Sequence, residues 1–299
     1  MRIRVFVSFN EGRSRYAFVR KLLLAAGCGT EGLSGPDDFL CGLYGRTFEA
    51  DDPLLASLRK ALSEAGVKWS ERVSHDYLVY ELKQFPLLGL TVNRRSIDGG
   101  GPSDGTDYDL TSACPACGTG AVQTSPVLLR RAEVPGKGDL VQTHVWHLLI
   151  SERLAEVFRE RAVSGIELRQ ALLRRTRAPL PWWQILCSHT MPRAGPRTLG
   201  LLHDISPGWG CTVCNRDMYA ESTEQPLVLV YDRAEVDPAS LPDVVQTREC
   251  FGRSILRDDP ARHVVQGYAQ PMILINQKVF AILRELKVRH AFHTPVKIE

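Results

Sequence analysis

Two short cysteine motifs constrain this 299-residue chain more than any other feature. Cys114 and Cys117 form one C-x-x-C motif, and Cys211 and Cys214 form a second. The tight turn of each motif brings two sulfurs to one face, and two such turns complete a tetrahedral shell of four thiolates. A shell without an open position favours a structural ion over a catalytic one. We therefore expect one structural Zn²⁺ with these four cysteines as its ligands.

The residue after each motif fits a metal-binding turn. Gly118 follows the first motif and Asn215 the second. Both residue types tolerate the left-handed backbone that lets amides turn toward the sulfurs. The alternative for either motif is a reducible thiol pair. Because a four-thiolate site contributes directly to folding, we expect the apoprotein to be unfolded around both motifs.

The remaining cysteines are scattered, and each is expected to be a buried free thiol, since free cysteine behaves as a small apolar residue. They are Cys28, Cys41, Cys187 and Cys250. The first residues lack the features of a signal peptide, and no stretch approaches 18 uninterrupted apolar residues, so we expect a cytoplasmic protein with no membrane partner. In a reducing compartment, paired C-x-x-C motifs indicate a metal and not disulfides.

Three other pairs of residues have spacings that could serve a second metal site. They are Cys187 with His189, His144 with His147, and His290 with His293. Isolated histidines of this kind are more often surface or structural residues, and we expect no second site. Cys187 and His189 also lack an orienting third group for nucleophilic catalysis.

The hydrophobic pattern predicts an α+β protein with two domains. Residues 1–97 are predicted to form a small N-terminal α/β domain, and residues 98–105 a glycine-rich linker or loop. Residues 106–299 are predicted to form an α+β zinc-ribbon domain carrying both cysteine motifs. Its two similar halves are expected at about residues 106–175 and 205–299.

Period-two and helical patterns place the elements of the first domain. A strand is expected over 2–9, and two helices follow, the first capped by Ser14 and the second started by Asp52 and Pro53. Glycines 27 and 66 are expected to end these helices. Further strands are predicted in the first domain at 77–82 and 87–92, and in the second at 178–186, 226–231 and 243–247.

An internal repeat supports the two halves. Residues 148–160 align without gaps on residues 273–285. In both copies, a short apolar run meets a capping residue, Ser151 or Asn276, and then an amphipathic helix whose second residue is basic, Arg153 or Lys278. A strand is predicted after each helix, at 166–172 and 291–298. We interpret the repeat as two related halves that meet across one shared zinc ion.

A basic surface for nucleic acid is the main alternative to a protein-binding role. The candidate residues are Arg94, Arg95, Arg130, Arg131, Arg174, Arg175, Arg177, Trp182 and Trp183. Arginines beside aromatic rings suit backbone contact with base stacking. However, the chain has 37 basic and 34 acidic residues with no long run of one sign, so the pattern favours solvated loop arginines near core tryptophans.

The cysteine motifs, the helix pattern and the segment Thr294-Pro295-Val296 together resemble the double-CxxCG motif proteins of myxobacteria. The resemblance covers roughly residues 105–299 and is carried by Cys114, Cys117, Gly118, Cys211 and Cys214. The second motif lacks the glycine of that family, and a longer segment precedes the first motif. Some members are immunity proteins for polymorphic toxins. The resemblance therefore implies a zinc-stabilised binding protein that neutralises a cognate toxin.

Together these observations lead to a protein-binding module without enzymatic activity, plausibly immunity-like, as the expected function. The closed metal shell and the lack of a convincing set of acid, base and nucleophile motivate this expectation. A nucleic-acid-binding zinc-ribbon protein is the alternative. An enzyme with its site in the first domain or at the interdomain loop is a third hypothesis. The sequence does not indicate an oligomeric state.

Overall fold

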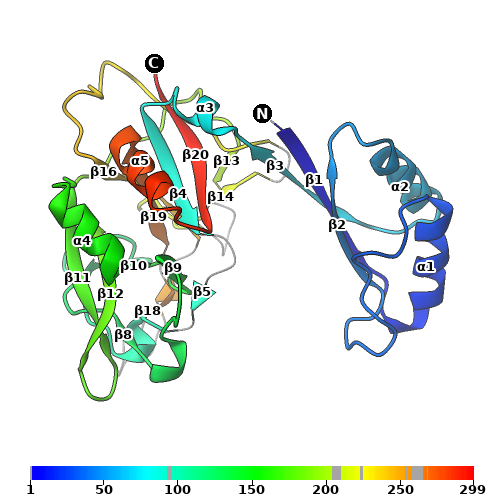
Figure 1. Ribbon diagram of the computed structural model, residues 1–299, viewed down its shortest axis with the longest axis horizontal. Helices are drawn as coiled ribbons and strands as arrows, with labels where there is room; N and C mark the ends of the chain where they lie inside the picture. Colours follow the sequence, from blue (N-terminus) through cyan, green and yellow to red (C-terminus); the bar gives the residue numbers. More distant parts are fainter. Residues whose placement is uncertain are drawn as a thin grey trace. The chain divides into compact units, whose positions relative to one another are not determined.

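The computed structural model describes residues 2–92, 96–97, 99–203, 210–222, 225–252, 255–256, 265–267 and 269–299. Both helices and strands are present, as expected for the α+β class (Figure 1). The chain divides into two compact units. Unit 1 comprises Met1–Glu81 with Ser222–Pro226, and unit 2 comprises Leu82–Glu221 with Leu227–Glu299.

Unit 1 is a three-stranded antiparallel sheet with two helices. Strand β1 (Arg2–Asn10) lies between β2 (Leu43–Glu49) and β3 (Ser70–Asp76). The predicted alternation of the first strand is confirmed, because Val5, Val7 and Phe9 are buried on one face. Helices α1 (Tyr16–Ala25) and α2 (Pro53–Glu64) contribute to the same core.

The two helices of unit 1 differ in how they begin. Asp52 caps α2 as predicted, since its carboxylate accepts a hydrogen bond from the Leu54 amide at 2.9 Å. The expectation for Ser14 was wrong: it lies inside a 3₁₀ turn, η1 (Arg13–Arg15), and Arg15 precedes α1 without a side-chain cap. Both helices are followed by glycines at positive φ, Gly27 at 74° and Gly66 at 65°.

The strand predicted at 77–82 is also wrong. Residues Val79–Leu82 form a short helix, α3, and the strand lies earlier, as β3. The reason is tertiary: β3 pairs along the length of β1, with Arg72 opposite Phe6, and this pairing outweighs the weak local pattern of a polar segment. The predicted strand at 87–92 is confirmed as β4 (Leu87–Val92), but it belongs to unit 2 and not to the N-terminal domain in which it was expected.

Unit 2 contains two large sheets, each with one helix. The first sheet has the order β5-β9-β10-β12-β11-β8 and the second β13-β14-β16-β19-β4-β20-β15. The strands of the first sheet are β5 (Ser96–Ile97), β8 (Leu128–Leu129), β9 (Leu140–Thr143), β10 (Leu148–Ser151), β11 (Ile166–Leu173) and β12 (Pro179–Cys187). Those of the second, besides β4, are β13 (Leu201–His203), β14 (Tyr219–Glu221), β15 (Leu229–Tyr231), β16 (Val244–Phe251), β19 (Gln270–Asn276) and β20 (Ala291–Ile298).

Smaller elements complete unit 2. They are the two-stranded sheets of β6 (Tyr108–Asp109) with β7 (Val122–Gln123) and of β17 (Ile255–Leu256) with β18 (Val265–Gly267), and the 3₁₀ turns η2 (Pro102–Asp104) and η3 (Arg131–Glu133). Helix α4 (Glu152–Glu160) follows β10, and α5 (Gln277–Glu285) follows β19. The helices and strands expected in the aligned segments are therefore present. None of the helices within the described residues is both long and apolar enough to cross a membrane.

The two large sheets share one strand order. In the first, β9, β10, β12, β11 and β8 are neighbours, and in the second β16, β19, β4, β20 and β15 take the same places. In both sheets the first three of these pairings are antiparallel and the last is parallel. The register around the central strand also agrees. Ile150 pairs with Trp183 and Ile166 with Cys187 in the first sheet, and Ile275 pairs with Leu88 and Ala291 with Val92 in the second. Ile275 and Ala291 each follow their counterparts by 125 residues, whereas Leu88 and Val92 each precede theirs by 95.

The central strand of each sheet comes from outside the half in which the sequence placed that sheet. The second sheet takes β4, which precedes residue 106, whereas the first takes β12, which follows residue 175. Just after β4, strand β5 pairs in parallel with β9 of the first sheet, and just after β12, Thr190 pairs in parallel with Gln246 of β16. Each central strand therefore leads directly into the opposite sheet, so the sheets exchange strands reciprocally.

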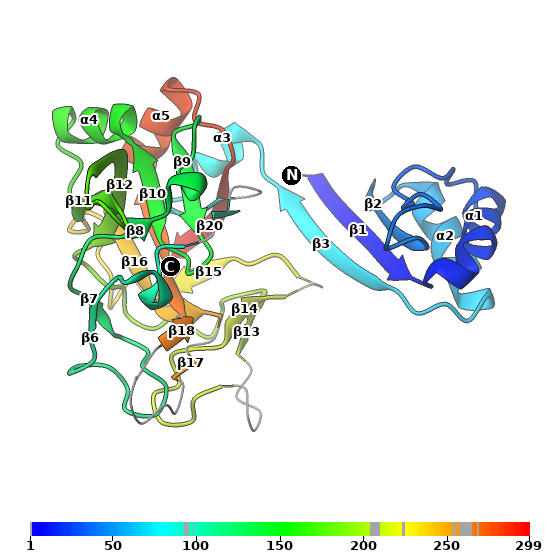
Figure 2. The ribbon, with the colours of Figure 1, turned by 90° about the horizontal axis from the view of Figure 1, so that it is seen from below.

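The helices α4 and α5 lie side by side in both views (Figures 1 and 2). Their contacts are partly reciprocal: Arg153 of α4 donates to the Leu286 carbonyl at 3.4 Å, and Lys278 of α5 donates to the Ala162 carbonyl at 3.0 Å. Arg161 and Glu285 add an ion pair at 2.6 Å. The basic residue near the N-terminus of each helix thus contacts a backbone carbonyl just beyond the C-terminus of the other helix.

The glycine-rich segment is a packed loop and not an exposed linker. Residue 98 lies outside the described residues, but glycines 99, 100 and 101 are buried, as is Asp104 in η2. The Gly99 amide donates to Nδ1 of His144 at 3.0 Å. The segment is buried because β5, just before it, pairs with β9, which draws the backbone into unit 2.

Candidate metal centre

Each cysteine motif is the turn of a short β-hairpin. Strands β6 and β7 flank the first motif, and β13 and β14 flank the second. Both hairpins are antiparallel, with Tyr108 opposite Gln123 in one and His203 opposite Tyr219 in the other. Each pair of cysteines therefore lies in the connection between two paired antiparallel strands.

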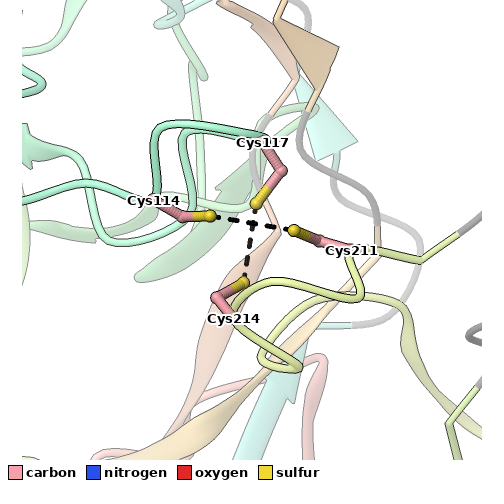
Figure 3. Close-up of side chains that lie close together, drawn as sticks. All are labelled: Cys114, Cys117, Cys211 and Cys214. Atoms are coloured by element: carbon pink, nitrogen blue, oxygen red, sulfur yellow. Dashed lines mark hydrogen bonds between the residues drawn. The ribbon is translucent and has the colours of Figure 1, made fainter.

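The structure brings all four predicted ligands together (Figure 3). Their sulfur atoms all lie within 4.8 Å of one another. Two of the approaches join equivalent positions of the two motifs: Cys114 to Cys211 at 3.7 Å and Cys117 to Cys214 at 3.6 Å. A tetrahedral metal with bonds of about 2.3 Å to sulfur separates its ligands by about 3.8 Å. The sulfurs are therefore spaced as the shell of one tetrahedral ion, well beyond disulfide length.

The two turns have the same backbone. The amide of Gly118 donates to the Cys114 carbonyl at 2.7 Å, and the amide of Asn215 donates to the Cys211 carbonyl at 3.0 Å. Both residues after the motifs take a left-handed conformation, with φ of 79° at Gly118 and 51° at Asn215. Glycine and asparagine adopt this conformation at the lowest cost, which explains their presence here.

Cys117 and Cys211 are buried, Cys114 and Cys214 are partly buried, and the sulfurs are hydrogen-bonded. Burial raises the pKa of Cys117 and Cys214, because a thiolate loses solvation there. At Cys114, burial also raises the pKa, but hydrogen bonds from the Ala116 and Cys117 amides outweigh it and the pKa is lowered. A dication would stabilise all four thiolates, whereas without one the buried sulfurs of Cys117 and Cys214 favour the protonated form.

A basic residue from one motif reaches toward the other. Nη1 of Arg216, which follows the second motif, lies 3.4 Å from the position of a Cβ built on Gly120, beyond the first motif. Four thiolates around a dication carry net negative charge, and a nearby guanidinium offsets it. The Cys211 amide is itself held by the buried carboxylate of Asp217 at 2.9 Å. The Asp217 contact therefore orders the second motif, and Arg216 lies close to the loop of the first.

The chemistry of such a site is structural. Four thiolates saturate a tetrahedral ion, so no position is left for water or substrate. Tetrahedral sulfur shells suit zinc and also iron. The donor set therefore fits a metal ion, and the four cysteines are the residues that would hold it.

The structure does not gather the other candidate ligands into a comparable cluster. Among the described residues, no other group of three or more histidine, cysteine or acidic side chains brings its ligand atoms together. His147 instead shares a 2.6 Å hydrogen bond with the Tyr108 hydroxyl, and burial lowers its pKa to about 4. His293 packs edge-on against Phe280, and burial lowers its pKa to about 4.

The remaining members of those pairs also have other surroundings. Burial raises the pKa of Cys187 to about 12, which is the opposite of what a nucleophile requires. His189 and His290 are exposed, and His144 accepts the hydrogen bond from Gly99.

The tryptophans predicted as a stacking surface are engaged within the fold. Trp182 is buried, and its indole donates to the Pro135 carbonyl at 3.3 Å. Trp183 donates to Glu152 at 2.8 Å, and the guanidinium of Arg159 covers its ring at 4.0 Å. Trp182 is therefore inaccessible to a base, and one face of the Trp183 ring is covered. Arg94 and Arg95 lie outside the described residues.

Two acidic residues that the sequence analysis overlooked anchor the helix caps. Asp139 accepts from Ser151 at 2.9 Å and from Arg153 at 3.0 Å. Asp243 accepts from Asn276 at 2.8 Å and from Lys278 at 2.7 Å. An ungapped alignment could not reveal this equivalence, since the aspartate precedes the cap by 12 residues in one copy and by 33 in the other.

No protein-family model and no curated protein matches the sequence. The resemblance to the double-CxxCG proteins therefore depends on the cysteine motifs and the helix pattern alone.

Proposed function

We propose that unit 2 is a zinc-stabilised protein-binding module built from two related halves. The gathering of Cys114, Cys117, Cys211 and Cys214 at tetrahedral spacing is the observation that carries the proposal. The shared strand order, the matching register around each central strand and the matching Asp139 and Asp243 networks support the two halves. In the proposed arrangement, the ion joins one hairpin from each half, and its role is to hold the binding surface together.

The partner we propose is a protein, and the resemblance to immunity proteins makes a cognate toxin the specific candidate. A closed thiolate shell supports a binding role over catalysis, since it has no site for substrate. The alternative role in nucleic-acid binding has less support, because Trp182 and Trp183 both contact other residues of the fold. On this proposal the protein is cytoplasmic, where its thiols stay reduced.

Metal analysis tests the first part of the proposal. The full chain purified without added metal should contain one zinc per chain by mass spectrometry of the element, and its visible spectrum should lack the thiolate bands of iron. Cys187→Ser should keep the zinc because Cys187 lies outside the cluster, whereas Cys114→Ser should lose it. Iron in place of zinc, or two zinc ions per chain, would contradict the assignment.

Capture experiments test the second part. The tagged full chain is crosslinked in native lysate with either the wild-type sequence or Cys114→Ser/Cys211→Ser, and captured proteins are quantified against each other. We expect a partner that is enriched by the wild type and lost with the double variant. If a toxin gene lies next to the gene for this chain, cells that express the toxin should stop growing, and co-expression of the chain should restore their growth. A lysate that yields no such partner, together with a substrate turned over by the purified chain, would overturn a binding role.

A further inference from the structure

Two arginine-rich segments of unit 2, residues 130–131 and 174–177, lie at one end of the first sheet. Strands β8 and β11 are parallel, and their last pair is Leu129 with Leu173. The next residues, Arg130 and Arg174, therefore follow at adjacent strand ends, where the Arg174 amide donates to the Leu129 carbonyl at 2.8 Å. We use the name arginine surface for Arg130, Arg131, Arg174, Arg175 and Arg177.

A buried aspartate orients two of these side chains. The Asp104 side chain is only 4% exposed, and its Oδ1 lies 3.4 Å from Nη2 of Arg130 and 3.3 Å from Nη1 of Arg174. Both guanidiniums thus share one carboxylate oxygen. One negative charge cannot neutralise two cations, and the fixed aspartate reduces the entropy that each arginine would lose on binding a ligand.

The remaining charges leave the arginine surface positive. Arg131, Arg175 and Arg177 are exposed. Glu133 also approaches the cluster, with its Oε1 3.6 Å from Nε of Arg130. The arginine surface thus has five guanidiniums, and the ion pairs found within the described residues join them to two carboxylates, Asp104 and Glu133. Each guanidinium has five N–H donors arranged as a planar fork.

The second sheet shows that the fold does not require arginine at this position. Glu299 is equivalent to Arg174, by the same 125-residue offset and by the same backbone contact, since its amide donates to the Tyr231 carbonyl at 3.0 Å. Its carboxylate pairs with Arg197 at 2.8 Å and Lys297 at 3.5 Å. An arginine thus stands at one strand end and a carboxylate at its counterpart, so the shared fold does not account for the arginines.

We propose that the arginine surface binds a carboxylate-rich segment of the protein partner, an inference that rests on the proposed function. Arginine forks bind carboxylates in a bidentate manner, which suits a compact, preorganised cluster. Single-stranded nucleic acid is the less favoured ligand, because its binding combines a basic groove with stacking on aromatic rings, and Trp182 and Trp183 are both engaged.

Fluorescence anisotropy on the full, metal-loaded chain tests the inference with two labelled probes, a deca-glutamate peptide and a 20-nucleotide single-stranded DNA. The test variant is Arg131→Gln/Arg175→Gln, which removes two exposed charges and leaves the Asp104 contacts in place. The matched control is Arg13→Gln/Arg20→Gln, which removes the same charge from exposed positions of unit 1. We expect the peptide to bind at least tenfold more weakly to the test variant, and the control to stay within twofold of the wild type.

The anisotropy measurements would overturn the inference by any of three results: no peptide binding at low ionic strength, equal weakening by test and control variants, or tighter binding of the DNA with the same dependence on Arg131 and Arg175. Circular dichroism and metal content of each variant verify that the fold is kept. If the crosslinked partner is still captured by the test variant, the inference fails while the proposed function stands. If the peptide binds as expected but no partner is captured, the proposed function fails instead.

Discussion

The two sheets of unit 2 have one architecture and different surroundings. Strand order, orientation and register agree between them, and each has an aspartate that holds the capping residue and the basic residue of its helix. They differ at the strand ends, where one sheet has Arg174 and the other Glu299. Features shared by both sheets are those that the fold needs, and features present in one alone are the candidates for function.

The exchange of β4 and β12 makes neither sheet complete without the other part of the chain. In each sheet, the strand before the helix and the strand after it lie on either side of a central strand. That central strand comes from the opposite copy. The cysteines also come in one pair from each copy. A metal ion bound by all four would therefore join the two copies, as the exchanged strands do. Metal binding and sheet formation should therefore be coupled.

Removing a cysteine of the cluster should lower the stability of unit 2 more than the other substitutions below. The similarity of the two motifs predicts an equal loss of stability for either one. Cys114→Ser and Cys211→Ser each remove one of four ligands from a site of the kind that supplies about 10 kcal/mol or more of folding free energy. We expect both variants to unfold unit 2 as a whole. Loss of near-ultraviolet circular dichroism and of amide protection across both sheets is the measurement, with Cys187→Ser as control. Protection lost around one motif only would show that the two sheets are not coupled.

Substituting the left-handed residue in the loop after each of the helices α4 and α5 should change the free energy of unfolding in opposite directions. Gly165 has φ of 84°, and a Cβ there would lie 2.1 Å from the Val244 carbonyl oxygen, so Gly165→Ala should cost about 3 kcal/mol. The equivalent residue in the second copy is the exposed His290 at φ of 67°. His290→Gly should stabilise the protein by about 1 kcal/mol, since it relieves the left-handed strain. Urea unfolding measures both, and destabilisation by His290→Gly would contradict the equivalence.

Substituting the two aspartates that hold the helix caps, Asp139 and Asp243, should give the smallest difference in stability between the two sheets. Asp243 accepts additional hydrogen bonds from the amide and hydroxyl of Ser164, at 2.8 and 3.0 Å. Asp243→Asn should therefore cost about 2 kcal/mol and Asp139→Asn about 1 kcal/mol at pH 7, the range for hydrogen bonds to charged groups. Equal costs, measured by urea unfolding, would show that the Ser164 contacts contribute nothing.

The effect of Asp243 should depend on pH. Burial raises its pKa, but the hydrogen bonds from Lys278, Ser164 and Asn276 outweigh burial, and the folded pKa lies below the ordinary value of 3.8. The stabilisation is therefore present above about pH 4 and is lost as the pH falls through the folded value. Repeating the unfolding of wild type and Asp243→Asn at pH 7 and near pH 3 should show the difference between them shrinking at the lower pH.

The metal centre could be predicted from sequence because its determinants are local. A C-x-x-C turn places two sulfurs without help from the rest of the chain, and the residues after it report the left-handed backbone directly. Helices α4 and α5 were predictable for the same reason, since Ser151 and Asn276 cap the helices that follow them. Two features of the sequence, spacing and capping, thus determined the ligands and the repeat.

Only the tertiary structure decided which strands complete each sheet and which charges meet. Local pattern identified β4 as a strand, but its partners β19 and β20 are nearly 200 residues away, and hydrophobic alternation does not encode a partner. Arg130 and Arg174 likewise come together because parallel pairing aligns the ends of β8 and β11. The sequence by itself determined the four cysteines that could hold a metal ion and the similar strand–helix patterns around α4 and α5. Long-range strand pairing, which depends on the register of distant segments, decided the exchange of strands and the arginine surface.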